Sequence, residues 1–144
     1  MATPVISEVV ASLFLVVSQL SGYPPPRAMP EIHVLSSVRL QEELCQGPCG
    51  VFAYYLDGRG VFIRDDLDVV NDLKSRSILL HELVHHLQHE HQRFTAMGNC
   101  ERWYAREEEA YRMQNAYLSS MRTATRFAFD FLPARCRELA PASD

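Results

Sequence analysis

A histidine-rich stretch in the middle of the chain, SILLHELVHHLQHEHQ (residues 77–92), constrains the fold more than any other feature. On a helical wheel of about 100° per residue, its leucines and valine gather on one side, and His81, Glu82 and His85 gather on the other. Such a segment is typical of a helix whose apolar side packs on a core while its polar side lines a cleft. The pattern predicts a helix over about residues 72–91.

The five residues from His81 to His85 read His-Glu-Leu-Val-His, which is an H-E-x-x-H motif. Residues four apart lie on one face of a helix, so the two imidazoles can bind the same metal ion. Zinc accepts imidazole nitrogen readily, and the intervening glutamate can reach a water at the metal as general base. The motif therefore predicts His81 and His85 as zinc ligands and Glu82 as the catalytic base.

His85 and His89 are also four residues apart, but they do not form a second H-E-x-x-H motif, because His86 stands where the glutamate would be. His89 lies one turn beyond His85 on the same side, where it could be a further ligand, a group that supports the ligands, or a donor to a reacting oxygen. His86 and His91 lie near the border and the end of the helix, where we expect surface or supporting positions. Glu90 falls on the far side.

A third ligand is expected from a second long helix, predicted over about residues 100–121. This helix carries three consecutive glutamates, and Glu107 shares an apolar and aromatic stripe with Tyr104 and Tyr111. The next two glutamates, ending at Glu109, are predicted to face solvent. A carboxylate on a stripe that faces the core is costly unless it is paired or coordinated. The pattern therefore predicts Glu107 as the third ligand.

The chain contains four cysteines, at positions that allow two disulfides. The turn CQGPC favours a local bridge between Cys45 and Cys49, which would leave Cys100 to pair with Cys136. Four cysteines allow three pairings, and four buried thiols are the alternative. Disulfides would indicate an oxidising compartment, so we expect a periplasmic or secreted protein, with a cytoplasmic one as the alternative.

The 144 residues fit a single α+β domain spanning 1–144. We expect an N-terminal amphipathic helix, a short antiparallel sheet, and then the two helices described above. The turn signal DGRG joins two of the three predicted strands, which span about residues 31–37, 51–56 and 60–65. Residues 9–20 are apolar but too short to span a membrane, although membrane contact or a removed signal segment remains a lesser alternative. The net charge of −4 and the lack of a basic cluster give no reason to expect a nucleic-acid partner.

Around the motif, the sequence resembles the zincin metallopeptidases, and in particular the gluzincins, whose third ligand is a glutamate on a following helix. ILLHELVHHL is similar to the active helix of zincins, and EEEAY (107–111) is similar to the E-x-x-A pattern of small HtpX-like and ImmA/IrrE-like peptidase domains. In those families the first glutamate of the pattern binds zinc, which maps onto Glu107. Tyr111 stands where they have aspartate or asparagine, so their usual supporting side chain is missing at this position. The resemblance covers roughly residues 50–118.

The motif and the resemblance together lead us to expect zinc-dependent hydrolysis of a peptide bond in a peptide or protein substrate. Glu82 would take a proton from the attacking water and pass it to the leaving amine. The substrate is expected to lie along an exposed strand edge, within 31–37 or 51–56. The candidates for holding the oxyanion are Tyr104, Tyr111 and His89.

Three alternatives stay open on the sequence. The first is a zinc-stabilised binding or effector module without turnover. The second is a purely structural histidine-rich helix. The third is hydrolysis of a non-peptide amide, in which Cys49 or Cys100 would be a free thiol at the metal.

Overall fold

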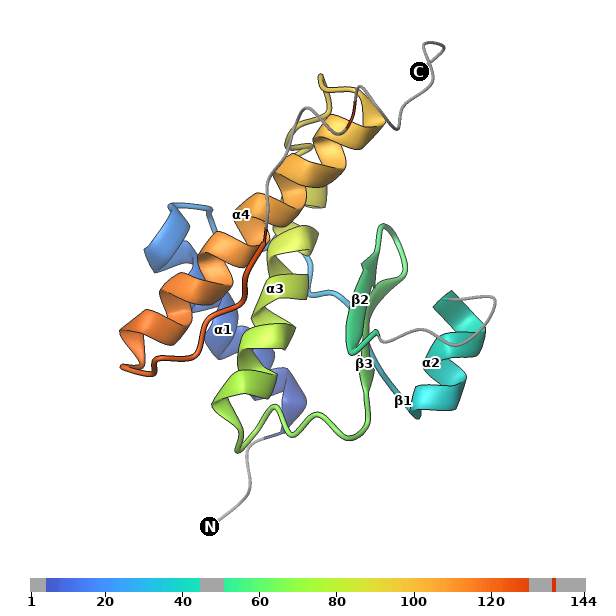
Figure 1. Ribbon diagram of the computed structural model, residues 1–144, viewed down its shortest axis with the longest axis vertical. Coiled ribbons are helices and arrows are strands. Elements are labelled where there is room, and N and C mark those ends of the chain that lie inside the picture. Colours follow the sequence, from blue (N-terminus) through green and yellow to red (C-terminus); the bar gives the residue numbers. More distant parts are fainter. Residues whose placement is uncertain (1–4, 45–50, 130–135, 137–144) are drawn as a thin grey trace.

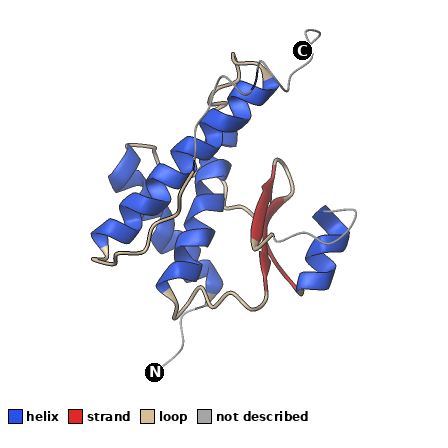
Figure 2. Cartoon of the chain, viewed as in Figure 1, coloured by secondary structure: helices blue, strands red, loops and turns tan. Residues whose placement is uncertain are grey.

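The computed structural model describes residues 5–44, 51–129 and 136 of the chain. These residues form a mixed helical and strand domain, which confirms the predicted α+β class (Figures 1 and 2). In chain order the elements are α1 (Ile6–Ser21), β1 (Ile32–Leu35), α2 (Ser37–Leu44), β2 (Ala53–Leu56), β3 (Gly60–Arg64), α3 (Leu73–Glu90) and α4 (Asn99–Ser120). None of the helices in this described part is long and apolar enough to cross a membrane.

The three strands pair in the order β1-β3-β2. The predicted hairpin is present, because β2 runs antiparallel to β3 and Gly58 and Gly60 adopt the positive φ that the tight turn needs. The prediction of a wholly antiparallel sheet is wrong, however, since β1 pairs with β3 in parallel. The chain passes through α2 and β2 between these two strands, so it returns to β3 in the direction of β1.

Helix α2 is an element that the sequence patterns did not reveal. The predicted strand ran to residue 37, but the chain turns into a helix directly after β1. Ser36 starts this helix, because its hydroxyl oxygen accepts a hydrogen bond from the Arg39 N–H at 3.2 Å. Leu40 is the buried anchor of α2, and the other side chains of this short helix lie nearer to solvent, which explains its weak apolar signal.

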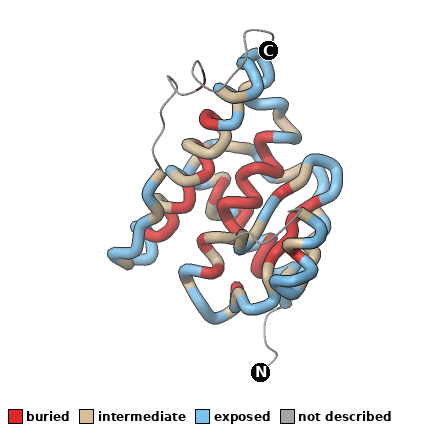
Figure 3. The backbone as a smooth tube through the Cα atoms, turned by 45° about the vertical axis from the view of Figure 1, so that its right-hand side comes forward, coloured by how far each residue is buried: buried red, intermediate tan, exposed pale blue. Residues whose placement is uncertain are grey.

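The core is built around α3, which lies between α1 and α4 on one side and the sheet on the other (Figure 1). Buried backbone is concentrated along this helix (Figure 3). Asp72 is its N-cap and accepts hydrogen bonds from the backbone N–H and the hydroxyl of Ser75. The apolar side chains that α3 buries completely are Leu79, Leu80, Leu83, Val84 and Leu87. A helix enclosed on several sides holds its polar motif rigidly.

A connector between α1 and β1, at residues 22–31, lies across the end of α3 and is fastened to it. The Glu90 carboxylate accepts hydrogen bonds from the backbone N–H groups of Arg27 and Ala28, both at 3.0 Å. At the far end of the chain, Cys136 forms a disulfide with Cys100 at the start of α4, so the predicted pairing of these two cysteines is confirmed. The predicted Cys45–Cys49 bridge lies outside the described residues.

Candidate metal centre

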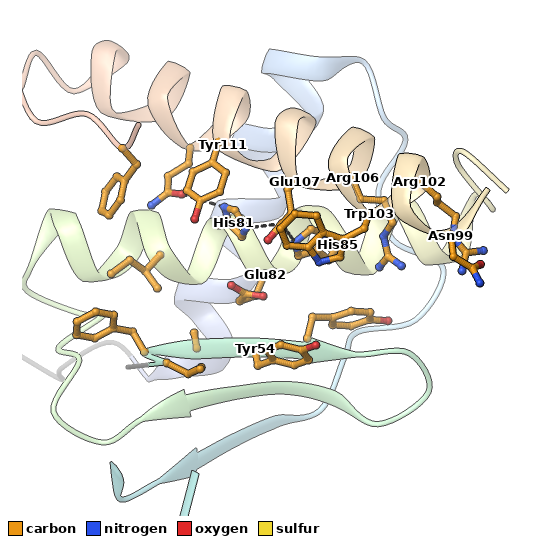
Figure 4. Close-up of a pocket in the computed structure, with 17 residues that line it drawn as sticks. Tyr54, His81, Glu82, His85, Asn99, Arg102, Trp103, Arg106, Glu107 and Tyr111 are labelled. Carbon is orange, nitrogen blue, oxygen red and sulfur yellow. Dashed lines mark hydrogen bonds and ion pairs between the residues drawn. The ribbon is translucent and has the colours of Figure 1, made fainter. Parts of the chain in front are cut away.

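The three predicted ligands come together between α3 and α4. His81 and His85 lie one turn apart on α3, and Glu107 reaches them from α4 (Figure 4). Glu107 Oε2 is 3.1 Å from His81 Nε2 and 2.6 Å from His85 Nε2. One ligand atom from each residue lies within 4.8 Å of the other two, so this group could hold a metal ion.

Gln88 fixes which nitrogen of His85 carries the proton. Its side-chain NH₂ donates to the carbonyl of Arg106 at 2.9 Å and to the Glu109 carboxylate at 3.0 Å. Both of those partners only accept, so the amide oxygen of Gln88 must face His85 Nδ1, at 2.8 Å. His85 therefore donates from Nδ1, which leaves the lone pair of Nε2 directed at the metal centre.

Gln114 acts on His81 in the same way. Its NH₂ donates to the hydroxyl of Ser77 at 3.2 Å, because that hydroxyl is already donating to the carbonyl of Lys74 at 2.7 Å. The amide oxygen of Gln114 then accepts from His81 Nδ1 at 3.0 Å. The two candidate ligand histidines thus both present Nε2, and each is held by a glutamine, His85 by Gln88 on the same helix and His81 by Gln114 on α4.

The two Nε2 lone pairs and the Glu107 carboxylate oxygen repel one another unless a proton or a metal ion lies between them. Burial alone would raise the pKa of Glu107, but its hydrogen bonds with His81 and His85 outweigh burial and hold that pKa far below its usual range. Burial lowers the pKa of His81, yet the hydrogen bond with Glu107 and the charge of Glu82 together raise it. A metal ion bound here would take the place of the protons in these hydrogen bonds.

Glu82 lies beside the three ligands without joining them. Its carboxylate accepts a hydrogen bond from the backbone N–H of Tyr55 in β2. Burial raises its pKa, and the charges of His81 and His85 oppose that effect only in part. A buried carboxylate with a raised pKa, next to a metal centre and facing a cleft, is suited to accepting a proton near neutral pH.

A cleft of about 540 Å³ opens onto the centre between α4 and β2, with α3 as its floor (Figure 4). This volume is in the range of ligand-binding pockets. Among the three candidates for holding an oxyanion, Tyr111 lines the cleft and packs against His81 with ring centroids 4.4 Å apart. Tyr104 is buried beside the cleft rather than in its wall, and His89 lies outside it.

His89 and His86 take positions that the helical wheel did not predict. The side chain of His89 is 45% exposed and pairs with Asp57 at 3.5 Å, past the end of β2, so it lies apart from the group formed by His81, His85 and Glu107. His86, predicted at a surface or supporting position, is buried because the connector covers it. Its Nε2 donates to the carbonyl of Ala28 at 2.7 Å, and its Nδ1 accepts from the Tyr55 hydroxyl at 3.1 Å.

Glu109 was predicted to face solvent and is instead buried, with 5% of its surface exposed. Its carboxylate accepts hydrogen bonds from the Tyr23 hydroxyl at 2.5 Å, from Gln88 and from Arg93. The wheel failed here because α4 packs on the connector as well as on α3. The wheel could have found Gln88, one turn after His85, but nothing in α4 alone points to Tyr23.

Cys100 is bonded to Cys136, so it is not the free thiol that the non-peptide amide alternative requires. Cys49, the other candidate thiol, lies outside the described residues.

Comparison with known proteins identifies the family of this chain but gives no activity for it. Residues 2–139 match the model of DUF6647, which is described as a domain of unknown function. No curated protein and no solved structure matches the chain.

Proposed function

This chain belongs to the family DUF6647, whose description names no activity, and we propose from its site that it is a zinc-dependent peptidase of the gluzincin type. One observation carries the proposal. The buried carboxylate of Glu82 lies beside a group of two imidazoles and one carboxylate, inside an open cleft. Two histidines and a glutamate are the ligand set of zinc peptidases that keep a fourth position for water.

Zinc is the metal that best suits these donors, because imidazole nitrogens with one carboxylate oxygen in a buried setting match its preferences. Bound there, zinc would supply a Lewis acid that lowers the pKa of a coordinated water from about 16 towards ~7. The chain's own part is to fix the ligands. Gln88 and Gln114 hold His85 and His81 with Nε2 towards the metal.

Glu82 is the proposed general base. Its carboxylate lies between the ligands on α3 and strand β2, where it can take a proton from water and return it to the leaving amine. Tyr111 is the proposed partner of the oxyanion, since its ring packs on His81 in the cleft wall. Burial raises the pKa of Tyr111, so its hydroxyl stays protonated and can donate.

The free edge of β2 is the proposed place for the substrate backbone. Phe52 pairs with β3 through its carbonyl, which accepts from the Arg64 N–H at 3.0 Å. Because hydrogen-bonding groups alternate along a strand, Ala53 and Tyr55 turn their N–H and C=O groups to the outer edge, towards Glu82. An extended peptide could add to this edge and bring its carbonyl to the metal.

A disulfide between Cys100 and Cys136 fits a protein that works in an oxidising compartment, and we propose a periplasmic or secreted location. The thiol–disulfide state of these cysteines in protein isolated from its source, trapped by alkylation, tests this.

The decisive test compares the wild-type protein with Glu82→Gln on a peptide library after zinc loading. Glu82→Gln should keep about one zinc per chain and lose cleavage by at least about a thousandfold, because it removes the base but no ligand. Glu107→Ala should lose zinc, and Glu108→Ala, at the adjacent and partly exposed glutamate, should behave as wild type in both assays.

The alternatives give different results in the same experiment. If the Glu82→Gln protein still cleaves peptides, Glu82 is not the general base. Full zinc binding by Glu107→Ala would exclude it as a ligand. Stable zinc binding without cleavage of any peptide would point instead to a zinc-stabilised binding module.

A further inference from the structure

The cleft has two ends of different chemistry, with the metal centre between them. Helices α3 and α4 run antiparallel. His81 on α3 bonds to Gln114 on α4, and Gln88, which comes later on α3, bonds to the carbonyl of Arg106, which comes earlier on α4. Positions along either helix therefore mark positions along the cleft. The helix rises about 18 Å between Arg102 and Gln114, which matches about five residues of an extended peptide.

The end beyond His81 is apolar. Ile78, one turn before His81 on α3, lines it together with Phe52 and Phe127. Phe127 is fixed in place because its backbone N–H and C=O bond to the side chain of Asn115 on α4, at 2.8 and 2.9 Å. This end offers a preformed apolar wall to a substrate side chain.

The end beyond His85 is cationic. Arg102 and Arg106 project from the first turns of α4 towards this end, beside Trp103 (Figure 4). Arg106 is partly engaged, with Asp57 at 3.4 Å and the Gln88 amide oxygen at 3.3 Å. The Arg102 guanidinium makes no hydrogen bond or ion pair with any side chain in the described part of the protein, so its charge is available to a ligand.

A second hollow, of about 750 Å³, continues the cationic end away from the metal centre. It shares Tyr55, Arg102 and Arg106 with the cleft. Five of the chain's fourteen basic residues line it, although the chain as a whole carries a net charge of −4. One of the acids in its wall, Glu90, is already bonded to the connector backbone. Glu31 and Asp57 are the other acids in this wall, so its five basic residues exceed its three acidic ones by two.

We propose that the substrate is a peptide segment with an acidic side chain on the Arg102 side of the cleaved bond and a large apolar side chain on the other side. This inference rests on the proposed function, because it names the substrate class of the same cleft. A guanidinium binds a carboxylate through two parallel hydrogen bonds, which gives direction as well as affinity. The apolar wall at the opposite end fixes the register of the peptide.

The test uses zinc-loaded protein and a library of acetylated, amidated peptides, so that side-chain carboxylates are the only anions present. Wild type should cleave peptides with Glu or Asp two or three residues to one side of the bond, and Phe or Leu on the other side. Arg102→Gln should lower the rate on acidic peptides about five- to tenfold relative to their Gln-substituted counterparts. Arg102→Glu should reverse the preference towards Lys.

Arg112→Gln is the matched control, because Arg112 lies on the same helix but lines neither hollow. It should leave the preference unchanged. Cleavage without acid preference, or a preference that Arg102→Gln does not alter, would overturn this inference and leave the peptidase proposal standing.

A binding measurement separates the two proposals if no peptide is cleaved. Fluorescence anisotropy of a labelled acidic peptide with zinc-loaded wild type should then show salt-sensitive binding that weakens about five- to tenfold in Arg102→Gln. In that case the recognition surface stands and the proposed catalysis fails. Equal binding of acidic and neutral peptides would overturn the inference as well.

Discussion

At the scale of single residues, two side-chain amides determine which nitrogen each histidine of the candidate metal centre turns towards the metal. Gln88 and Gln114 each have their NH₂ tied to an acceptor elsewhere, so each can offer only its oxygen to a ligand histidine. In the small peptidase families with which we compared the sequence, an acidic or amide side chain stands at the place of Tyr111. Here Gln114, nearly one turn further along α4, bonds to the ligand histidine instead.

Removing the Gln114 amide should weaken zinc binding. Gln114→Leu leaves His81 without its acceptor, and we expect the zinc affinity to fall about ten- to a hundredfold. Gln114→Glu should restore most of it, because a carboxylate accepts the same hydrogen bond. Competition with a chromophoric chelator measures the affinity, with Glu108→Ala as the control on the same helix. Equal affinity in a folded Gln114→Leu protein would refute this role.

The sequence predicted which three side chains come together as candidate ligands but not the side chains that support them, for a physical reason. His81 and His85 follow from helical spacing, and Glu107 follows from its place on an apolar stripe, so both inferences need only one helix at a time. The burial of Glu109 depends on Tyr23, which lies 86 residues away in the chain. A pattern within one element cannot reveal a partner that only the tertiary fold supplies.

At the scale of elements, the end of α3 holds the connector through one carboxylate. Burial alone would raise the pKa of Glu90, but hydrogen bonds from the Arg27 and Ala28 N–H groups outweigh it and hold that pKa below its usual range. A carboxylate with a lowered pKa in the folded state stabilises the fold above its unfolded pKa of about 4.3. That stabilisation is lost as the pH falls through the folded pKa.

Glu90→Gln should therefore lower the free energy of unfolding by about 1 kcal/mol at pH 7. The difference from wild type should shrink as the pH falls below about 4, because the wild-type carboxyl then becomes protonated. Urea unfolding between pH 3 and 7 measures both effects. Glu8→Gln, at an exposed position of α1, is the control, and a difference that does not depend on pH would contradict the assignment.

The elements themselves were predicted unevenly. The long helices and the β2–β3 hairpin follow from periodicity and from the turn residues, which are local signals. The parallel pairing of β1 with β3 joins Ile32 to Val61 across α2 and β2, and no local pattern specifies it. Helix α2 was not predicted because it has only 8 residues and buries only Leu40, so its sequence contains too few apolar residues to mark a helix.

At the scale of the whole molecule, the candidate metal centre lies between the two longest helices of the described structure, and a bound ion would join them. A ligand that binds only the folded state stabilises it by about 4 kcal/mol at a thousandfold excess over Kd. For a chain of this size that corresponds to roughly a 10 °C rise in Tm. Chelation with EDTA should lower Tm by this amount, and added zinc should restore it.

Differential scanning fluorimetry measures the shift, and Glu107→Ala is the control that should respond to neither EDTA nor zinc. A wild-type Tm that is the same with and without zinc would argue against a metal that bridges α3 and α4. Magnesium in place of zinc should have little effect, because it prefers oxygen ligands.

The free edge of β2 has a consequence for how copies of this chain meet one another. An open strand edge is a template on which a second molecule can extend the sheet and begin to aggregate. Here the edge is only four residues long, and it borders a cleft that α4 overhangs (Figure 4). A single extended chain fits beside it, whereas an intact sheet from another copy would collide with the helix. The overhang thus leaves more room beside this edge for one extended chain than for the sheet of a second copy.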